Sequence, residues 1–239
     1  RDLDVTGVQT CALPIYPLNE SSHNGFAADI YRSRNHEAAR RACYRGLVAY
    51  PYIAELKLIA AETELWRGNF KKGWALFEER LDPRMSPARI ALPPLWENRA
   101  EDPGHLFVAA EQGIGDEYVF LSFLPALAEK VDRLTVECDE RNLPLYARSF
   151  PGVAFIGRHI RADEHGRAIF DYSHWSGRRD VDHAIFAGSL PGLFVNDAQE
   201  PGLRGGYLKD DETEKAAWKS KFDRLGNKPK IGICWRSGL

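Results

Sequence analysis

The residues best suited to chemistry lie in one short segment, Glu-Gln-Gly-Ile-Gly-Asp over residues 111–116. Gly113 and Gly115 permit a backbone turn that side chains would block, and they allow a ligand to approach the backbone closely. Asp116 is predicted at or just inside the start of a helix, with its carboxylate facing a cleft. Two interpretations of Asp116 stay open. It is a helix cap, since Asp satisfies free amide hydrogens there, or a general base that acts by position on an acceptor hydroxyl.

The flanking elements place this segment where ligands commonly bind. Residues 105–111 form a predicted strand, and residues 116–131 form a helix with a bend at its proline. Because open α/β sheets bind ligands at the carboxyl ends of their strands, we expect Glu111 and Gln112 to line an acceptor cleft together with both glycines. The pattern is not a dinucleotide fingerprint, because Tyr118 stands where GxGxxG has its third glycine.

Strands and helices alternate after residue 104. Further strands are predicted over residues 133–138, 153–156, 168–172 and 230–235. Further helices are predicted over residues 141–150, 189–194 and 211–225. This alternation is typical of a mostly parallel sheet covered on both faces, so we predict a Rossmann-like α/β domain.

The N-terminal third repeats itself with a period of about thirty-four residues, the length of a tetratricopeptide repeat. Its helices are predicted over residues 22–33, 36–50, 54–67 and 70–80. The first unit resembles the tetratricopeptide repeat at Ala39, Cys43, Gly46 and Pro51. The second unit fits less well: Gly73 and Phe77 are in place, but Arg80 stands at a usually small position. Two plain helical hairpins that cap the α/β domain remain the alternative.

Composition excludes several classes of protein. A formal net charge of -2 gives no electrostatic case for nucleic acid, and no apolar run is long enough to cross a bilayer. The four cysteines form no CxxC pair, which argues against a structural zinc site and a disulfide-stapled secreted domain. We therefore expect a cytoplasmic protein with buried thiols, no metal and no cofactor.

Both ends of the chain are unusual. Residues 5–15 resemble the translation of a sequencing-library adapter, so residues 1–15 are expected to lie outside the fold. Residues 228–239 are predicted to begin a further domain, which implies that the chain is an internal piece of a longer protein. In that segment Arg236 and Ser237 could approach a donor phosphate, or they are ordinary loop residues.

An ordered set of motifs resembles the tetratricopeptide-linked glycosyltransferases related to ADP-heptose:lipopolysaccharide heptosyltransferases. The motifs are residues 109–127, Trp96, Phe-Pro-Gly-Val at 150–153, Gly-Ser-Leu-Pro at 188–191 and Ile-Gly-Ile-Cys-Trp at 231–235. The resemblance implies a GT-B layout of two Rossmann-like domains, with the nucleotide-sugar bound mainly to the second. It also implies that Asp116 is the catalytic base. Pro125 follows that aspartate about one helical turn late, so the identity of the sugar does not carry over.

Five segments follow from these predictions: residues 1–15 adapter-like, 16–83 helical repeats, 84–104 linker, 105–227 acceptor domain, and 228–239 the start of a donor domain. The predicted activity is inverting transfer from a nucleotide-sugar to a sugar or protein acceptor, with a protein partner held by the repeats. The chain alone is expected to be inactive, because the donor half is missing. The alternative is a non-catalytic scaffold with a degenerate α/β domain, which would bind no nucleotide-sugar.

Overall fold

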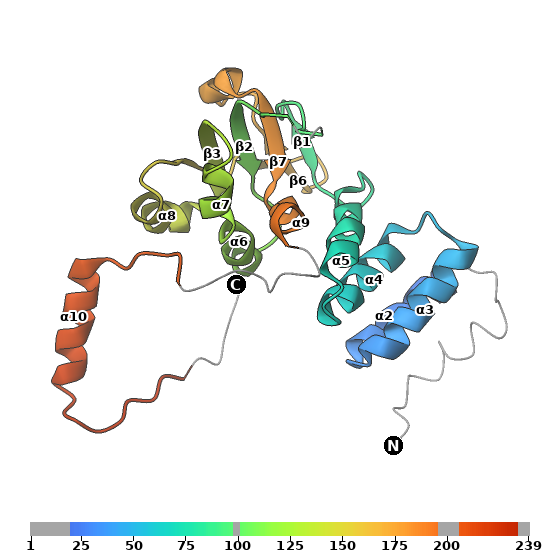
Figure 1. Cartoon of the computed structure of the whole chain (residues 1–239), viewed down its shortest axis with the longest axis horizontal. Helices are drawn as coiled ribbons and strands as arrows, with labels where there is room; N and C mark the ends of the chain where they lie inside the picture. Colours follow the sequence, from blue (N-terminus) through green and yellow to red (C-terminus); the bar gives the residue numbers. More distant parts are fainter. Residues whose placement is uncertain (1–19, 98–100, 196–205, 234–239) are drawn as a thin grey trace.

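The computed structural model describes residues 20–97, 101–195 and 206–233, which form a helical N-terminal region, an α/β body and a separate C-terminal helix (Figure 1). The helical region comprises α2 (Glu20–Arg32), α3 (His36–Ala49), α4 (Ala54–Trp66), α5 (Phe70–Phe77) and the 3-10 turn η1 (Glu78–Leu81). The four α-helices match the predicted ones closely. The last predicted helix tightens into η1 after Phe77, before it reaches Arg80.

Small residues let the helices of this region pack closely. A β-carbon on Gly46 of α3 would lie 2.7 Å from Leu56 Cδ1 in α4, and one on Gly73 of α5 would lie 2.6 Å from the Leu65 side chain. Asn35 begins α3, since its side-chain oxygen accepts a hydrogen bond from the Ala38 amide at 3.1 Å. These close approaches make the helical region one packed layer with its own apolar core.

The α/β body is built on a four-stranded parallel sheet of order β4-β3-β2-β7. Its strands are β2 (His105–Ala109), β3 (Arg133–Cys138), β4 (Ala154–Gly157) and β7 (His183–Phe186). Alternate side chains of β2 enter different cores. Leu106 and Val108 face the helical layer, whereas Phe107 and Ala109 face the opposite side. The prediction of an α/β unit after a helical region is thus confirmed, and β7 was not predicted.

Helices cover one face of the parallel sheet, and a second sheet covers the other. The helical layer comprises α6 (Ile114–Leu121), α7 (Leu124–Ala128), α8 (Leu143–Ser149) and α9 (Leu190–Phe194). The second sheet, of order β1-β6-β5, comprises β1 (Ala88–Ile90), β6 (Ala168–Asp171) and β5 (Ile160–Ala162). Strand β1 comes from the predicted linker, and the Trp96 amide donates to the Ala184 carbonyl at 2.8 Å. The predicted linker is therefore part of the body.

The helix predicted over residues 116–131 is two helices. It starts earlier, at Ile114, and stops at Leu121, and α7 starts at Leu124. Pro125 lies in the first turn of α7, where its missing amide hydrogen costs no hydrogen bond. The proline therefore begins a new helix and does not bend a continuous one. Similarly, the helix predicted over residues 141–150 begins as the 3-10 turn η2 (Glu140–Asn142) and continues as α8.

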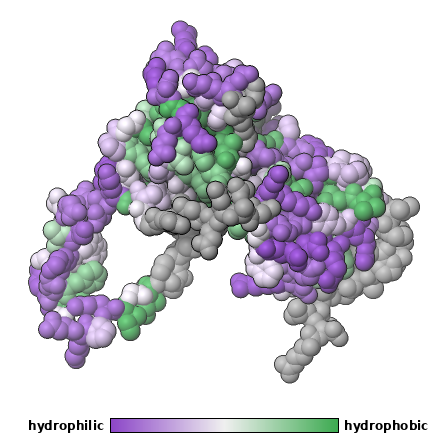
Figure 2. All heavy atoms as spheres, in the orientation of Figure 1, coloured by the Kyte–Doolittle hydropathy of each residue, from purple (hydrophilic) through white to green (hydrophobic). Residues whose placement is uncertain are grey.

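The C-terminal helix α10 (Glu212–Asp223) stands apart from the body (Figure 1). It has no buried residue, and its Trp218 is 50% exposed; Figure 2 shows hydrophobic residues open to solvent along this arm. The strand predicted over residues 230–235 is wrong for the described part, because Ile231 and Ile233 are exposed and lie in no strand. A strand needs a neighbour for its backbone groups, and no strand of the described residues pairs with residues 230–233; Cys234 and Trp235 lie outside the described residues.

Three expected properties can be compared with the described residues. None of their helices is long and apolar enough to cross a membrane, and they contain no group of three metal-ligating side chains that could hold an ion. Cys43 and Cys138 are buried and free, as predicted. Burial raises the pKa of each thiol to about 12, so neither is a nucleophile at neutral pH.

Candidate functional site

The candidate site lies at the carboxyl end of β2, beside the point where the strand order reverses. The chain adds β3 and β4 on one side of β2 and then crosses to add β7 on the other. In an open α/β sheet, ligands bind at such a switch point, outside the carboxyl ends of the strands. The loop after β2 carries residues 110–113, and the 3-10 turn η4 (Ala187–Ser189) follows β7.

The turn between β2 and α6 is made by Gln112. This residue has a φ of 56°, in the left-handed region, whereas Gly113 has a φ of -88° and Gly115 lies within α6. The prediction that the glycines supply the tight turn is therefore wrong. A β-carbon at Gly115 would meet no atom within 4 Å, so packing does not require glycine there. What the two exposed glycines provide is open backbone beside Asp116.

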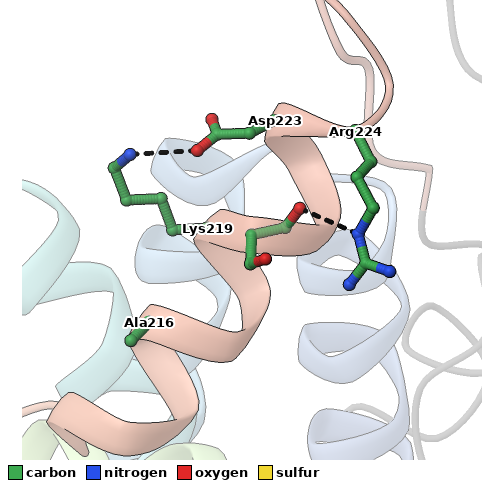
Figure 3. Close-up of a pocket in the computed structure, with 5 residues that line it drawn as sticks. Ala216, Lys219, Asp223 and Arg224 are labelled. Atoms are coloured by element: carbon green, nitrogen blue, oxygen red, sulfur yellow. Dashed lines mark hydrogen bonds and ion pairs between the residues drawn. The ribbon is translucent and has the colours of Figure 1, made fainter.

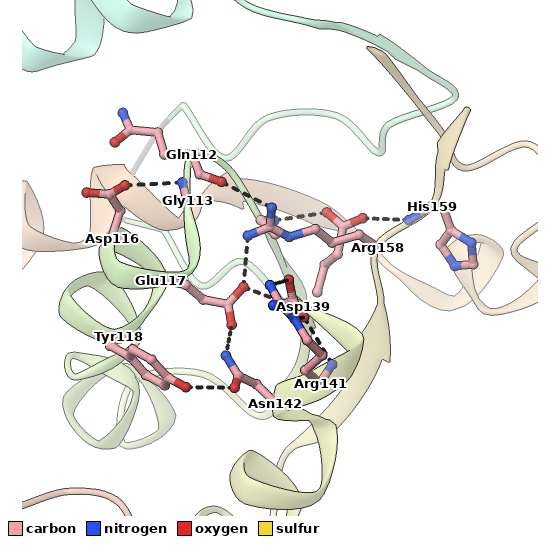
Figure 4. Close-up of polar contacts among 12 residues, drawn as sticks. Gln112, Gly113, Asp116, Glu117, Tyr118, Asp139, Arg141, Asn142, Arg158 and His159 are labelled. Atoms are coloured by element: carbon pink, nitrogen blue, oxygen red, sulfur yellow. Dashed lines mark hydrogen bonds and ion pairs between the residues drawn. The ribbon is translucent and has the colours of Figure 1, made fainter. Parts of the chain in front are cut away.

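Asp116 is the third residue of α6, and its side chain is exposed. One carboxylate oxygen, Oδ2, accepts a hydrogen bond from the Gly113 amide at 3.1 Å (Figure 4). This contact is the capping interaction of the first interpretation. Because the cap uses one carboxylate oxygen and the side chain is open to solvent, the geometry is equally compatible with the role of Asp116 as a general base.

Glu117, the next residue, is 1% exposed and points into the body. It accepts hydrogen bonds from the Asp139 amide at 2.8 Å, from Asn142 Nδ2 at 2.9 Å and from Arg158 Nη2 at 3.0 Å (Figure 4). Sequence reasoning missed this residue. The available signal was its helical spacing, since Glu117 precedes the buried Phe120 by three residues and so shares its face.

Arg158 joins the loops at this edge of the sheet. It follows β4, donates from Nη1 to the Gln112 carbonyl at 3.1 Å and pairs with Glu117 through Nη2. Its Nε is buried without a hydrogen-bond partner. The left-handed conformation of Gln112 is therefore held in place by a charged donor from the segment that follows β4.

Glu111 anchors the helical region to the switch point. Arg80 of η1 donates from Nε and Nη2 to the two Glu111 oxygens at 2.9 and 2.8 Å, and both side chains are buried. Arg80 Nη2 also donates to Ser189 Oγ at 2.9 Å, and the Gly188 amide donates to Glu111. Glu111 and Gln112 do line one cavity, of about 300 Å³, but both oxygens of Glu111 are already bound.

Glu137 of β3 is a third buried carboxylate. Its oxygens accept hydrogen bonds from the Ala110 amide and the Tyr172 hydroxyl, both at 2.9 Å, and from the His159 amide at 3.2 Å. Burial raises the pKa of Glu137 above its ordinary value despite these donors. Burial likewise raises the pKa of the Tyr172 hydroxyl. This cluster fixes the second sheet against the end of β3.

The site therefore contains three buried glutamates that are held by donors and one exposed aspartate. Neither Arg236 nor Ser237 can be placed beside them, because both lie outside the described residues. A hollow of about 480 Å³ elsewhere is lined only by α10 and Arg224 (Figure 3). Its polar contacts, such as Lys219 to Asp223 at 3.0 Å, stay within that helix, so it brings no separate elements together.

Comparison with known proteins finds a distant relationship at the level of sequence. No family model matches the chain. Over 198 residues the chain is 29% identical to Protein FlbA of Caulobacter vibrioides, a match that covers 77% of this chain and 32% of that protein. The chain thus spans about a third of the length of the relative it matches.

Proposed function

We propose that the protein carrying this chain is an inverting, metal-independent glycosyltransferase of the GT-B layout, with residues 105–227 as its Rossmann-like acceptor domain. The observation that carries the proposal is the exposed Asp116 carboxylate, at a helix start beside two open glycines and at the carboxyl edge of a parallel sheet. The motif resemblance supports the same assignment.

In this proposal the acceptor lies over Gly113 and Gly115. Its hydroxyl gives its proton to the Asp116 oxygen that makes no capping bond, and the hydroxyl oxygen attacks the anomeric carbon of the nucleotide-sugar. The bond from that carbon to the diphosphate breaks, and the nucleoside diphosphate leaves with the electron pair. The attack comes from the face opposite the leaving group, so the anomeric configuration inverts. Asp116 contributes mainly by position, since Gln112 and Arg158 fix the turn that carries it.

The helical region is proposed to be a tetratricopeptide-type scaffold for a protein partner. Its close helix contacts at Gly46 and Gly73 support this reading. The buried Arg80–Glu111 pair would hold such a partner in a fixed direction relative to the site. Arg236 and Ser237 remain candidates for donor contacts.

The test is transfer by the polypeptide translated from the complete open reading frame. The protein is incubated with a panel of nucleotide-sugars and acceptors, and release of nucleoside diphosphate is followed. We expect release that requires an acceptor, with a product whose anomeric proton coupling in NMR shows inversion. Release that is independent of the acceptor, or a product with retained configuration, would contradict the mechanism.

A second candidate is a non-catalytic scaffold, and one observation favours it. Arg80, Glu111 and Ser189 occupy the switch point that a ligand would use in a simple open sheet. This hypothesis predicts that the complete protein binds a protein partner but no nucleotide-sugar. Saturable nucleotide-sugar binding in calorimetry counts against it.

A further inference from the structure

Helices α3 and α5 of the helical region carry an excess of positive charge. Together they contain five lysine or arginine side chains and one carboxylate: Arg40, Arg41, Arg45, Lys71, Lys72 and Glu37. The whole chain, by contrast, has 32 basic and 34 acidic side chains. Because the chain as a whole is nearly balanced, an excess of this size on two helices is a local feature that a charged partner can recognise.

Side chains from three elements bring these charges to one surface. Glu37 of α3 accepts hydrogen bonds from Arg41 Nη1 at 3.4 Å and from Arg67 Nη1 at 2.6 Å. Arg67 is the C-cap residue of α4. From α5, Lys72 Nζ lies 4.3 Å from the ring centroid of Tyr44 in α3. We call the surface formed by Arg40, Arg41, Arg67 and Lys72 the basic surface.

The carboxylates within the basic surface balance only half of its positive charge. Glu37 accepts from all three arginines of the surface, with Arg40 bonded through Nε and Nη2 at 3.2 and 3.0 Å. Glu64 of α4 is 3% exposed and lies 3.4 Å from Lys72 Nζ. In the part of the chain that the structure describes, four cations therefore share two carboxylates.

The basic surface is open to solvent. The side chains of Arg41, Arg67 and Lys72 are 64%, 43% and 54% exposed. A guanidinium has five N–H donors, and the bonds of Arg41 and Arg67 to Glu37 each use one nitrogen. An acceptor can therefore reach these side chains from solvent, without entering the core.

An exposed tryptophan borders the basic surface. Trp66 is 66% exposed, and its ring stacks on that of His36 at a centroid distance of 4.8 Å. Both residues immediately precede the partners of the Glu37–Arg67 ion pair, so the two contacts lie side by side. Tryptophan and arginine are enriched among the side chains that dominate the binding energy of protein interfaces. The surface thus joins an apolar contact to a charged one.

We propose that the basic surface binds an acidic segment of a partner protein, whose carboxylates accept from the exposed cations while an apolar side chain packs on Trp66. A nucleic acid fits less well, because the chain as a whole has a net charge of -2 and lacks the broad basic excess that phosphate backbones require. The inference rests on the proposed scaffold role of the helical region and names the chemistry of the partner. It needs no sugar transfer, so a failure of binding and a failure of transfer are separate results.

The probe is a fluorescein-labelled peptide of alternating Glu-Leu-Glu units, titrated with the chain at low salt and followed by fluorescence anisotropy. A peptide with glutamine in place of each glutamate is the uncharged match, and an oligothymidylate of equal charge represents nucleic acid. We expect saturable binding of the acidic peptide that is lost at high salt, and at least about tenfold weaker binding of the glutamine peptide. Absence of saturable binding, or tighter binding of the oligothymidylate, would overturn the proposal.

Paired substitutions separate the basic surface from the rest of the molecule. Arg41→Gln with Lys72→Gln removes two exposed charges and should weaken peptide binding about tenfold. Arg41→Lys with Lys72→Arg keeps both charges and should retain binding. The control Lys219→Gln with Lys221→Gln removes two charges from α10 and should leave binding unchanged. Equal losses in the first pair and the control, or self-association of the chain that the first pair abolishes, would overturn the assignment to an acidic partner.

A further variant tests the apolar contact. Trp66→Ala should weaken binding of the acidic peptide at least about fivefold, as expected for an interface tryptophan. The matched control is Tyr52→Ala, which removes an exposed aromatic ring that precedes the start of α4 and should leave binding unchanged. Urea unfolding verifies that each variant stays folded. Unchanged binding in Trp66→Ala would contradict the proposed contact.

Discussion

Two kinds of carboxylate lie close together at the carboxyl edge of the sheet, and they differ in burial and in the number of hydrogen bonds that they accept. Glu111, Glu117 and Glu137 are buried, and each accepts at least three hydrogen bonds or ion-pair contacts. Asp116 is exposed and accepts one bond from its own helix start. A buried carboxylate that is fully bound holds loops in place, and it is costly to disturb. We propose that the exposed carboxylate is the one that takes part in chemistry.

The contrast is sharpest between neighbours in the sequence. Asp116 and Glu117 are consecutive, but successive residues of a helix point about 100° apart. One therefore faces solvent at the start of α6, and the other enters the core beside Asn142 and Arg158. The same helical turn thus supplies a candidate reactive group and the clamp that fixes its position.

The largest expected effect is on the buried ion pair between the helical region and the body. Arg80→Ala leaves the buried Glu111 carboxylate without its partner and should lower the free energy of unfolding by about 3–5 kcal/mol, measured by urea denaturation. The control is Arg41→Ala, whose pair with Glu37 is mostly exposed and contributes no more than about 0.5 kcal/mol. Similar costs for the two variants would contradict the anchoring role.

The next effect concerns pH and Glu137. The folded pKa of Glu137 is raised by burial, so between its unfolded and folded pKa values the folded state binds more protons than the unfolded state. The contribution of this group to stability therefore falls as pH rises above its ordinary value of 4.5. In Glu137→Gln this dependence should vanish, so the stability of the natural protein relative to the variant should decline with rising pH. A relative stability that increases over that range would contradict a raised pKa of Glu137 in the folded state.

Asp116 should matter less for stability. Asp116→Ala removes the bond to the Gly113 amide and should cost about 0.5–2 kcal/mol, the usual range for a lost cap. The comparison is Asp211→Ala, which removes the side-chain cap of α10, bonded to the Thr213 amide at 3.0 Å. Since α10 buries no residue, that variant should not lower the cooperative unfolding midpoint. A larger loss for Asp116→Ala would place Asp116 with the structural carboxylates.

The smallest effect is expected in α10. Trp218→Ala removes a side chain that is half exposed, and the change should stay within about 0.5 kcal/mol. In Phe120→Ala, by contrast, a buried ring of the core is lost, which should cost about 3–5 kcal/mol. Calorimetric melting of both variants gives the comparison. A large loss for Trp218→Ala would show that α10 packs on the body in solution.

The sequence predicted those features that depend on local pattern. Strand β3 and the helices of the N-terminal region follow their apolar periodicity. A turn between β2 and α6 was also expected, but it is made by Gln112 and not by the glycines. Features that depend on distant partners were not predictable in this way. The Arg80–Glu111 pair joins residues thirty-one positions apart, and its signal was an arginine at a usually small repeat position.

Two further differences have the same origin. The left-handed turn at Gln112 is held by Arg158, which follows β4. The sequence pattern instead predicted the turn at the two glycines. Residues 230–233 have the alternating pattern of a strand, but no described strand lies beside them to pair with. Alternation alone does not make a strand when its neighbour is absent.

The most direct test of the contrast between the carboxylates is turnover and stability measured together for Asp116→Asn in the complete protein, beside Asp211→Asn. If Asp116 is the base, nucleoside diphosphate release should fall about 10²–10⁴-fold while the free energy of unfolding changes by no more than about 2 kcal/mol. Asp211→Asn should leave both unchanged. Turnover that survives in Asp116→Asn would show that Asp116 is a helix cap and would contradict its role as the base.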